Sequence, residues 1–229
     1  MGIFCFRDDE VSVNRELFLQ VKIIGIFIEG DVADRRHVRL VEKVILSDLM
    51  DCNNINIKSD NMYRRMAMKR VAIITSSDTG YQGRREDLSG PAIKEIVERE
   101  GYQVVSMDIL PDDRSMLSKR MVEIADENQA ELILTTGGTG FSPRDVMPEA
   151  TEDITERKVP GIPEAIRAYS MTITNRAMLS RATAGIRKQT LIINLPGSPK
   201  AVKESLEYII GALGHGIEIM TGEAGNCAR

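Results

Sequence analysis

Short β-rich runs alternate with amphipathic helical segments along the last two thirds of this chain. The first run, RVAIITSS (residues 70–77), is suited to a fully buried strand. A helix is predicted to begin near Pro91 and to end near Gly101. Strands separated by helices of about 10 to 15 residues are typical of βαβ units. The pattern therefore predicts an α/β fold with three layers, a mostly parallel sheet with helices on both faces.

The rest of this region continues the alternation. Three further strands are predicted, at QVVSMDIL, ELILTT and TLIINLP. Helical spacing of apolar residues is found around Leu117, Met121 and Ile124, in GIPEAIRAYSMT, and from Pro199 onward. In open parallel sheets, ligands bind beyond the carboxyl ends of the strands, so the loops that follow the strands are the expected place for a site.

The loop TTGGTGFSPRDVMPEAT (residues 135–151) directly follows the third predicted strand. Glycine tolerates positive φ and lets a ligand approach the backbone, so the amides of Gly137, Gly138 and Gly140 can form an anion-binding nest. A turn that merely needs flexible residues is the alternative. A second loop, LPGSPK, opens a helix at the same predicted edge, and helix N-termini attract phosphate, which favours the anion site.

Acidic residues at this edge indicate a metal ion. Asp112 and Asp113 follow the second predicted strand, and Asp145 follows the third. Each alone is most often a solvated carboxylate or a turn former, but a carboxylate beside a phosphate nest repels the ligand unless a cation lies between them. Mg²⁺ takes one or two carboxylates together with phosphate oxygens and water, and Arg144 or Lys200 could share the neutralisation. The combination indicates metal-assisted transfer of a phosphate-bearing group.

Composition and missing motifs argue against several other functions. The sequence lacks the Walker A, dinucleotide-binding and kinase motifs, and a net charge of −4 with 4% aromatic residues argues against a nucleic-acid partner. Two histidines and three widely spaced cysteines predict neither a zinc site nor a disulfide framework, which indicates a reducing cytoplasm. The apolar stretch LFLQVKIIGIFI is too short to span a bilayer, so no membrane association is expected.

Taken together, the motifs resemble the molybdopterin adenylyltransferase family. Five of them stand in the family's order and spacing: TSSDTGYQGRREDLSGP, PDD, TTGGTGFSPRDVMPEAT, AMLSRATAGIR and INLPGSP. This is the Mog/MoaB-type domain, also found as the G domain of gephyrin, and the resemblance covers roughly residues 69–220. Met147 stands where the family often has Thr, a departure of small expected effect. PRDVMPEAT with TITNRAMLSRA favours the MogA type over the MoaB type.

The resemblance implies an enzyme of molybdenum cofactor biosynthesis. The terminal phosphate of molybdopterin attacks the α-phosphate of Mg-ATP, which gives adenylyl-molybdopterin and pyrophosphate. Asp112 resembles the acid that supports Mg²⁺ and the nucleotide, and Asp145 resembles the essential acid beside the pterin phosphate. The predicted substrate- and nucleotide-binding residues are Ser76, Gly137, Gly138, Thr139, Gly140, Ser180, Pro196, Gly197 and Ser198.

The family also implies a cytoplasmic homotrimer whose product passes to a downstream molybdate-insertion protein of the MoeA type. A MoaB-like module that binds molybdopterin without catalysis is the alternative. The Mog/MoaB-type domain is expected over residues 69–222. Residues 1–68 match no recognised family and are interpreted as an added module, a disordered arm, or translation from an upstream start, with Met66 or Met68 as the real beginning; the last is favoured.

Overall fold

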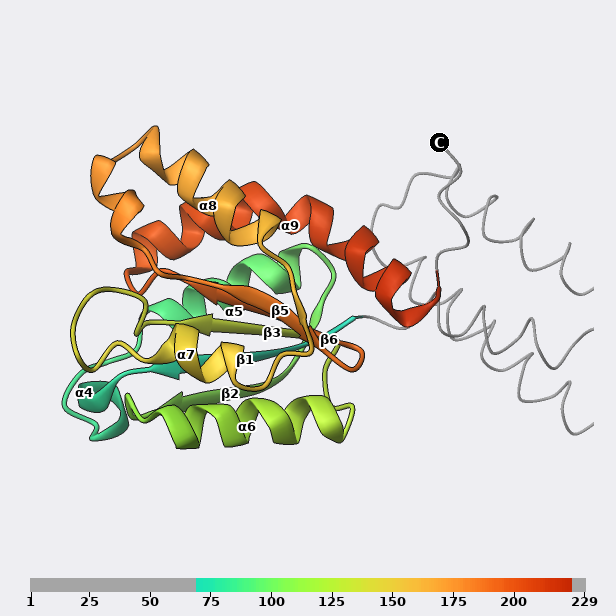
Figure 1. The fold of residues 1–229 in the computed structure, drawn as a ribbon, viewed down its shortest axis with the longest axis horizontal. Coiled ribbons are helices and arrows are strands. Elements are labelled where there is room, and N and C mark those ends of the chain that lie inside the picture. The colour runs from blue at the N-terminus through green and yellow to red at the C-terminus, as the bar shows by residue number, and fades with distance from the viewer. Residues whose placement is uncertain (1–68, 224–229) are drawn as a thin grey trace, which may run out of the picture. The chain divides into compact units, whose positions relative to one another are not determined.

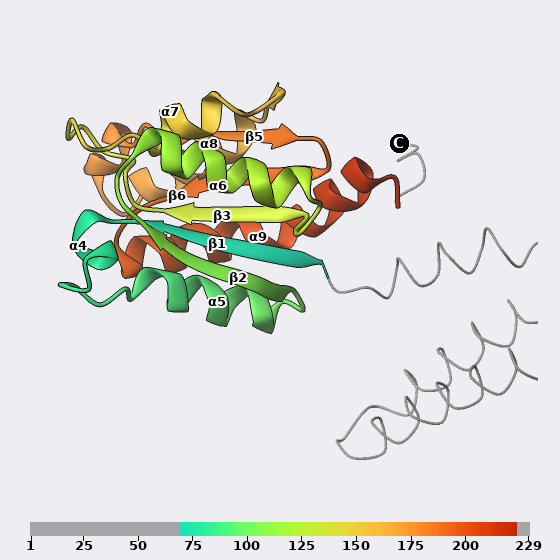
Figure 2. The same ribbon diagram turned by 90° about the horizontal axis from the view of Figure 1, so that it is seen from below.

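The structure, a computed structural model, describes residues 69–223 of the 229-residue chain. These residues form a six-stranded sheet in the order β2-β1-β3-β6-β5-β4, with helices on both faces (Figures 1 and 2). The predicted three-layer α/β fold is therefore confirmed. The expected extension over residues 1–68, with its two candidate start sites, lies outside the described residues.

Four parallel strands bring their carboxyl ends to one edge of the sheet. They are β1 (Arg70–Ser76), β2 (Gln103–Leu110), β3 (Leu132–Thr136) and β6 (Thr190–Leu195). The register pairs Ser76 with Leu110, and Thr136 with Leu195, so the loops that follow these strands start side by side. β3 and β6 are buried along their whole length because helices cover both faces of the sheet, whereas β2 is an edge strand with alternating exposure.

The helices divide into two layers that match two separate apolar cores. One core joins the sheet to α5 (Ser89–Arg99), α8 (Gly161–Met171) and α9 (Pro199–Thr221). The other joins it to α6 (Arg114–Asp126) and α7 (Met147–Glu152). The apolar stripes predicted from the sequence, such as Ile93, Ile96 and Val97 on α5, are buried in these cores. Within residues 69–223, no helix combines the length and apolarity needed to cross a bilayer.

Two strands and three short helical segments were not predicted. β5 (Ala184–Arg187) pairs antiparallel with β6, and β4 (Arg157–Lys158) pairs antiparallel with β5. These strands of four and two residues are too short for a pattern of alternation to identify them. The helical segments α4 (Asp78–Tyr81), η1 (Asn175–Leu179) and α7, which lies in the predicted loop at residues 135–151, have only four, five and six residues.

An ion pair joins β5 to the end of α6. The guanidinium of Arg187 donates to both carboxylate oxygens of Asp126 at 2.8 and 2.7 Å, and Lys188 Nζ lies 3.1 Å from the same group. The hydrogen bonds from Arg187, with a smaller contribution from Lys188, lower the pKa of Asp126 from 3.8 to about 2. The folded state therefore binds a proton at this carboxylate less readily than the unfolded state does.

We expect the Asp126 ion pair to stabilise the fold in a pH-dependent way. Because the folded pKa is lowered, the stabilisation is complete above the unfolded pKa near 4 and is lost as the pH falls from about 4 to about 2. Urea unfolding of wild type and Asp126→Asn should show a difference in free energy that is constant at pH 5 to 7 and shrinks below pH 4. A difference that persists unchanged at pH 2 would contradict this role of the ion pair.

Candidate active site

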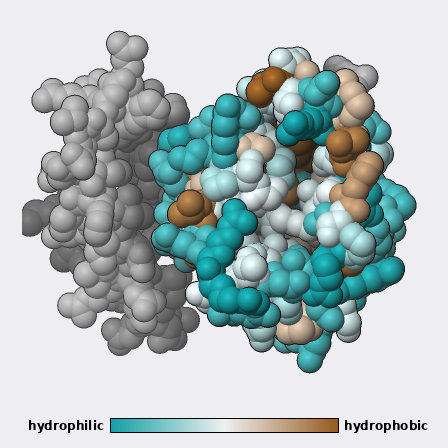
Figure 3. Space-filling model, turned by 90° about the vertical axis from the view of Figure 1, so that its left-hand side faces the viewer, coloured by the Kyte–Doolittle hydropathy of each residue, from teal (hydrophilic) through white to brown (hydrophobic). Residues whose placement is uncertain are grey.

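A cavity of about 300 Å³ opens at the carboxyl edge of the parallel strands. Six of the residues predicted from the sequence line it together: Ser76, Asp112, Gly137, Gly138, Asp145 and Gly197. They come from the ends of four strands or from the loops that follow them, so the shared edge is what brings them together. Figure 3 views this side of the molecule, where hydrophilic residues cover most of the surface and single hydrophobic side chains stand among them.

The conformation of the glycine loop at this cavity requires residues without a side chain. Gly137 and Gly138 have φ values of +91° and +64°, which favour glycine. A Cβ on Gly137 would lie 2.4 Å from the carbonyl oxygen of Ser76. Within residues 69–223, the amides of Gly138, Thr139 and Gly140 donate to no acceptor in the protein. The loop therefore offers three consecutive backbone donors, and of their residues Gly138 lines the cavity.

Asp112 is held at the ends of β1 and β2 by three hydrogen bonds. Its Oδ1 accepts from Ser76 Oγ at 2.5 Å, and its Oδ2 accepts from the Asp78 amide at 3.2 Å. The Asp112 amide in turn donates to Asp78 Oδ1 at 3.0 Å. The neighbouring acid, Asp113, has a different role, since it caps α6 by accepting from the Met116 amide at 2.9 Å. Of the two adjacent acids, Asp112 is the one that faces the cavity.

Asp145 reaches the same cavity from the glycine loop. Its Oδ2 accepts from the Ser142 amide at 2.8 Å, whereas its Oδ1 has no hydrogen-bond donor among the described residues. A Cβ on Gly140 would lie 2.9 Å from Asp145 Oδ2, so the loop folds closely around this carboxylate. The two acids predicted to converge from separate strand ends therefore line one cavity.

Arg144 connects the glycine loop to the loop after β1. Its guanidinium donates to both oxygens of Asp78, at 2.8 and 3.1 Å, and the Arg144 side chain is 60% exposed. The hydrogen bonding from Arg144, together with the bond from the Asp112 amide, lowers the pKa of Asp78, so Asp78 stays ionised beside the site. Lys200, the other predicted cation, does not line the cavity and pairs with Glu204 at 3.8 Å.

The two acids fit a metal ion that arrives with a phosphate ligand. Among residues 69–223, no group of three or more histidine, cysteine or acidic side chains could hold a metal alone. Mg²⁺ commonly takes one or two protein carboxylates and completes its shell with phosphate oxygens and water. Asp145 has an unoccupied carboxylate oxygen, and Asp112 is fixed nearby at the same cavity. The donor set therefore fits Mg²⁺ held jointly by the protein and a nucleotide.

Five residues predicted for the site do not line the cavity: Thr139, Gly140, Ser180, Pro196 and Ser198. Three of them make contacts within the protein. Pro196 accepts from Thr136 Oγ1 at 2.6 Å, Ser198 caps α9, and Ser180 Oγ accepts from the Ala182 amide at 3.3 Å. Their contacts with a substrate stay predictions.

The sequence reasoning missed Asp87, which also lines the cavity. Its Oδ1 accepts from the amides of Ser89 and Gly90 at 2.9 and 3.0 Å, and its Oδ2 accepts from Thr75 Oγ1 at 2.7 Å. Asp87 thereby joins the start of α5 to the end of β1. An acid directly before a helix with proline in its first turn is a recognisable capping signal, so this residue could have been found.

A buried polar network beneath the site was also missed. Asn194 Nδ2 donates to Thr135 Oγ1 at 3.0 Å and to Thr151 Oγ1 at 2.9 Å, and Asn194 Oδ1 accepts from the Thr183 amide at 3.2 Å. Asn194, Thr135 and Thr151 have no exposed surface. Satisfied buried networks fix one arrangement of the elements they join, here β3, β6, α7 and the segment before β5. The partners are 11 to 59 residues apart, so local patterns could not identify them.

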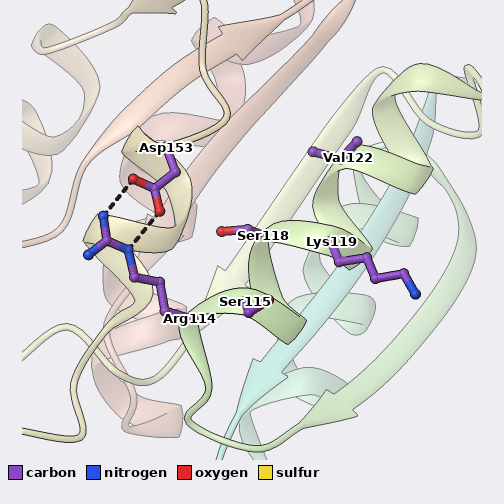
Figure 4. A pocket seen from close by; sticks show the side chains of 6 residues that line it. All are labelled: Arg114, Ser115, Ser118, Lys119, Val122 and Asp153. Atoms are coloured by element: carbon purple, nitrogen blue, oxygen red, sulfur yellow. Dashed lines mark hydrogen bonds and ion pairs between the residues drawn. The ribbon is translucent and has the colours of Figure 1, made fainter.

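A second, more open hollow of about 540 Å³ lies between α6 and the end of α7 (Figure 4). Arg114 crosses it and donates to both oxygens of Asp153, while Ser118 donates to the carbonyl of Ala150 at 2.9 Å. None of the predicted site residues lines it. Arg114 and Asp153 neutralise each other there, which leaves the cavity at the strand ends as the candidate active site.

Comparison with known proteins agrees with this geometry. A family model described as "Probable molybdopterin binding domain" matches residues 72–215. A molybdopterin adenylyltransferase of Helicobacter pylori is 38% identical over 154 residues, which cover 66% of this chain and 88% of that protein. The enzyme of the same name from Escherichia coli K12 is also 38% identical over 154 residues, covering 65% of this chain and 79% of that protein.

Solved structures give the same result. The crystal structure of the molybdopterin biosynthesis enzyme MoaB from Thermus thermophilus has a TM-score of 0.65 and is 44% identical. The similarity covers 68% of this chain and 98% of that one. The resemblance predicted from the five motifs is thus confirmed by a family model that spans most of the described residues. The chain belongs to the molybdopterin-binding domain family of molybdenum cofactor biosynthesis.

Proposed function

We propose that this protein is a molybdopterin adenylyltransferase that transfers AMP from ATP to molybdopterin. The observation that carries the proposal is the convergence of Asp112 and Asp145 on one cavity beside a glycine loop with unpartnered amides. Two curated relatives with 38% identity over most of their length carry the name of this activity, in agreement with the motif-based prediction. Both proposed reactants are anionic, and this determines what the protein has to supply.

In the proposed reaction, a phosphate oxygen of molybdopterin forms a bond to the α-phosphorus of ATP. The bond from that phosphorus to the bridging oxygen breaks, and the electron pair leaves with pyrophosphate. Two anions must therefore approach each other, and the protein has to hold them in line and neutralise their charge. We expect the unpartnered amides of Gly138, Thr139 and Gly140 to donate to phosphate oxygens, and Arg144, which pairs with Asp78, carries a positive charge on the same loop.

The carboxylates are proposed to act through Mg²⁺ bound with ATP. Asp112 and Asp145 would hold the ion, which when bound supplies charge neutralisation between the phosphates of the reactants. The bonds from Ser76 and Asp78 keep Asp112 in place before substrates bind, so little reorganisation is needed at that carboxylate. Ser142 orients Asp145 in the same way, with one carboxylate oxygen left for a ligand.

A direct assay tests the proposal. The full chain, incubated with molybdopterin, Mg²⁺ and ATP labelled at the α-phosphate, should release one pyrophosphate for each labelled adenylyl-molybdopterin formed. Omitting molybdopterin should remove both products. Tight molybdopterin binding without any labelled product, in the presence of Mg²⁺, would instead favour the binding-module alternative.

The proposal extends to assembly and pathway position. We propose a cytoplasmic homotrimer that hands its product to a molybdate-insertion protein of the MoeA type. Apolar side chains on the edge strand β2 support self-association, since Val105, Met107 and Ile109 are 40%, 42% and 39% exposed on one side of that strand.

A further inference from the structure

We infer that Arg181 is a positioning residue for the adenylyl transfer, because its guanidinium fixes the loop that carries Asp145 and the unpartnered amides. This inference rests on the proposed function. Arg181 does not line the cavity, so it is placed to act on the reaction through the loop rather than by contact with a substrate. It belongs to none of the elements that form the cavity wall and reaches the loop from the segment between η1 and β5.

Arg181 bonds to the glycine loop at both of its ends. Its Nε donates to the carbonyl oxygen of Gly140 at 2.7 Å, and one terminal nitrogen donates to the carbonyl oxygen of Asp145. Its backbone amide donates to the carbonyl oxygen of Thr139 at 2.9 Å. Three carbonyls of one loop are thus held by one residue that lies 36 to 42 positions further along the chain.

The carbonyl contacts determine where the neighbouring amides point. A peptide unit is planar, so a carbonyl that is held toward Arg181 turns the amide of the next residue away from it. The held carbonyls of Thr139 and Gly140 fix the peptide planes that include the amides of Gly140 and Phe141. The bond to the Asp145 carbonyl fixes the backbone that carries the carboxylate proposed to hold the metal ion. Losing these bonds would free the loop without removing any group that touches substrate.

Glu149 holds the guanidinium in this orientation. The other terminal nitrogen of Arg181 donates to Glu149 Oε1, and the two side chains are 33% and 36% exposed. Burial raises the pKa of Glu149, but the hydrogen bond from Arg181, a backbone hydrogen bond and the charges of Arg181 and Arg114 together outweigh it, so the pKa lies below its usual value and Glu149 stays charged. A second arginine steadies the same segment, since Arg167 donates to the Ala182 carbonyl at 2.8 Å.

A lysine at position 181 cannot reproduce these contacts. It keeps the positive charge beside Glu149 but presents one ammonium group, whereas arginine presents a planar fork that bonds several acceptors at fixed angles. Arg181→Lys therefore separates the orientation of the loop from the charge of the clamp. If Arg181 contributed only to general stability, Arg181→Lys would lower the free energy of unfolding without a specific effect on turnover.

Arg187 provides a matched control. It also bonds a carboxylate and a backbone carbonyl through its guanidinium, with Asp126 at 2.7 and 2.8 Å and Ile154 at 3.1 Å, and its side chain is 22% exposed. It does not line the cavity. Arg187→Lys should lower stability as much as Arg181→Lys does, with kcat within about twofold of wild type.

The experiment compares wild type, Arg181→Lys and Arg187→Lys in the full chain. Arg181→Lys should lower kcat about 30- to 100-fold and change the KM for ATP less than about threefold, since displacements of about 1 Å in a site cost rates of this order. Hydrogen exchange of residues 137–146 should become faster in Arg181→Lys and stay unchanged in Arg187→Lys. Glu149→Gln should also lower kcat and make hydrogen exchange of residues 137–146 faster, both to a smaller extent than Arg181→Lys.

Two results would overturn the inference. One is unchanged hydrogen exchange of residues 137–146 in Arg181→Lys. The other is a kcat that falls equally in both lysine variants, which would indicate a general loss of stability. If wild type itself makes no adenylyl-molybdopterin, the proposed function fails, and the exchange measurement still decides whether Arg181 orders the loop.

Discussion

Replacing Asp145 with asparagine is expected to lower kcat for adenylyl transfer about 10²- to 10³-fold while the protein stays folded. Asparagine has nearly the same shape and can still accept the hydrogen bond from the Ser142 amide, so the loop should keep its conformation. The negative charge is lost, and with it the unoccupied carboxylate oxygen that we assign to a metal ion. Turnover with α-labelled ATP and thermal unfolding of the same preparation measure the two effects separately.

Asp153→Asn is the matched control for this prediction. Asp153 follows α7 and, like Asp145, lies near the surface, but its carboxylate bonds Arg114 at the second hollow and does not line the cavity. This variant should keep kcat within about twofold of wild type. A turnover of Asp145→Asn that equals wild type would remove Asp145 from the catalytic account, whatever the effect on stability.

Replacing Gly137 with alanine is expected to have the largest effect on stability among substitutions in the site. The positive φ costs about 1 to 2 kcal/mol for an L-residue. The added Cβ would also lie 2.4 Å from the Ser76 carbonyl oxygen, a backbone atom that cannot move without shifting the end of β1. We expect a total loss of about 3 to 4 kcal/mol, with adenylyl transfer falling because Ser76 holds Asp112.

Gly101→Ala separates the two contributions to this loss. Gly101 has a similar φ of +81°, but nothing lies within 4 Å of an added Cβ. It should cost only the backbone strain, about 1 to 2 kcal/mol, and leave turnover unchanged. Urea unfolding of both variants gives the comparison. Equal losses of unfolding free energy in Gly101→Ala and Gly137→Ala would show that the contact with the Ser76 carbonyl does not contribute to the destabilisation.

The elements with a long and regular pattern could be predicted from the sequence. The buried strands at residues 70–76 and 190–195, and helix α9 with its apolar stripe, follow from periodicity and from proline and glycine at their ends. The convergence of Asp112 and Asp145 followed from one topological rule, that parallel strands end at the same edge of a sheet. This rule needs no knowledge of side-chain contacts.

The supporting contacts could not be predicted, because they join residues that are far apart in the chain. Arg181 and Glu149 are separated by 32 positions, and Asn194 and Thr135 by 59. A single arginine or asparagine in a loop has many alternative roles, and only the fold decides which acceptors it meets. Asp113 shows the opposite case, in which an acid at the predicted edge serves as a helix cap.

The central claim is that two carboxylates from separate strand ends share one divalent ion with a nucleotide. Electron paramagnetic resonance of Mn²⁺, measured with a non-hydrolysable ATP analogue, tests it most directly in wild type, Asp112→Asn and Asp145→Asn. We predict one Mn²⁺ per chain in wild type and at least tenfold weaker binding in each single variant. Mn²⁺ binding by both variants with the affinity of wild type would contradict the claim.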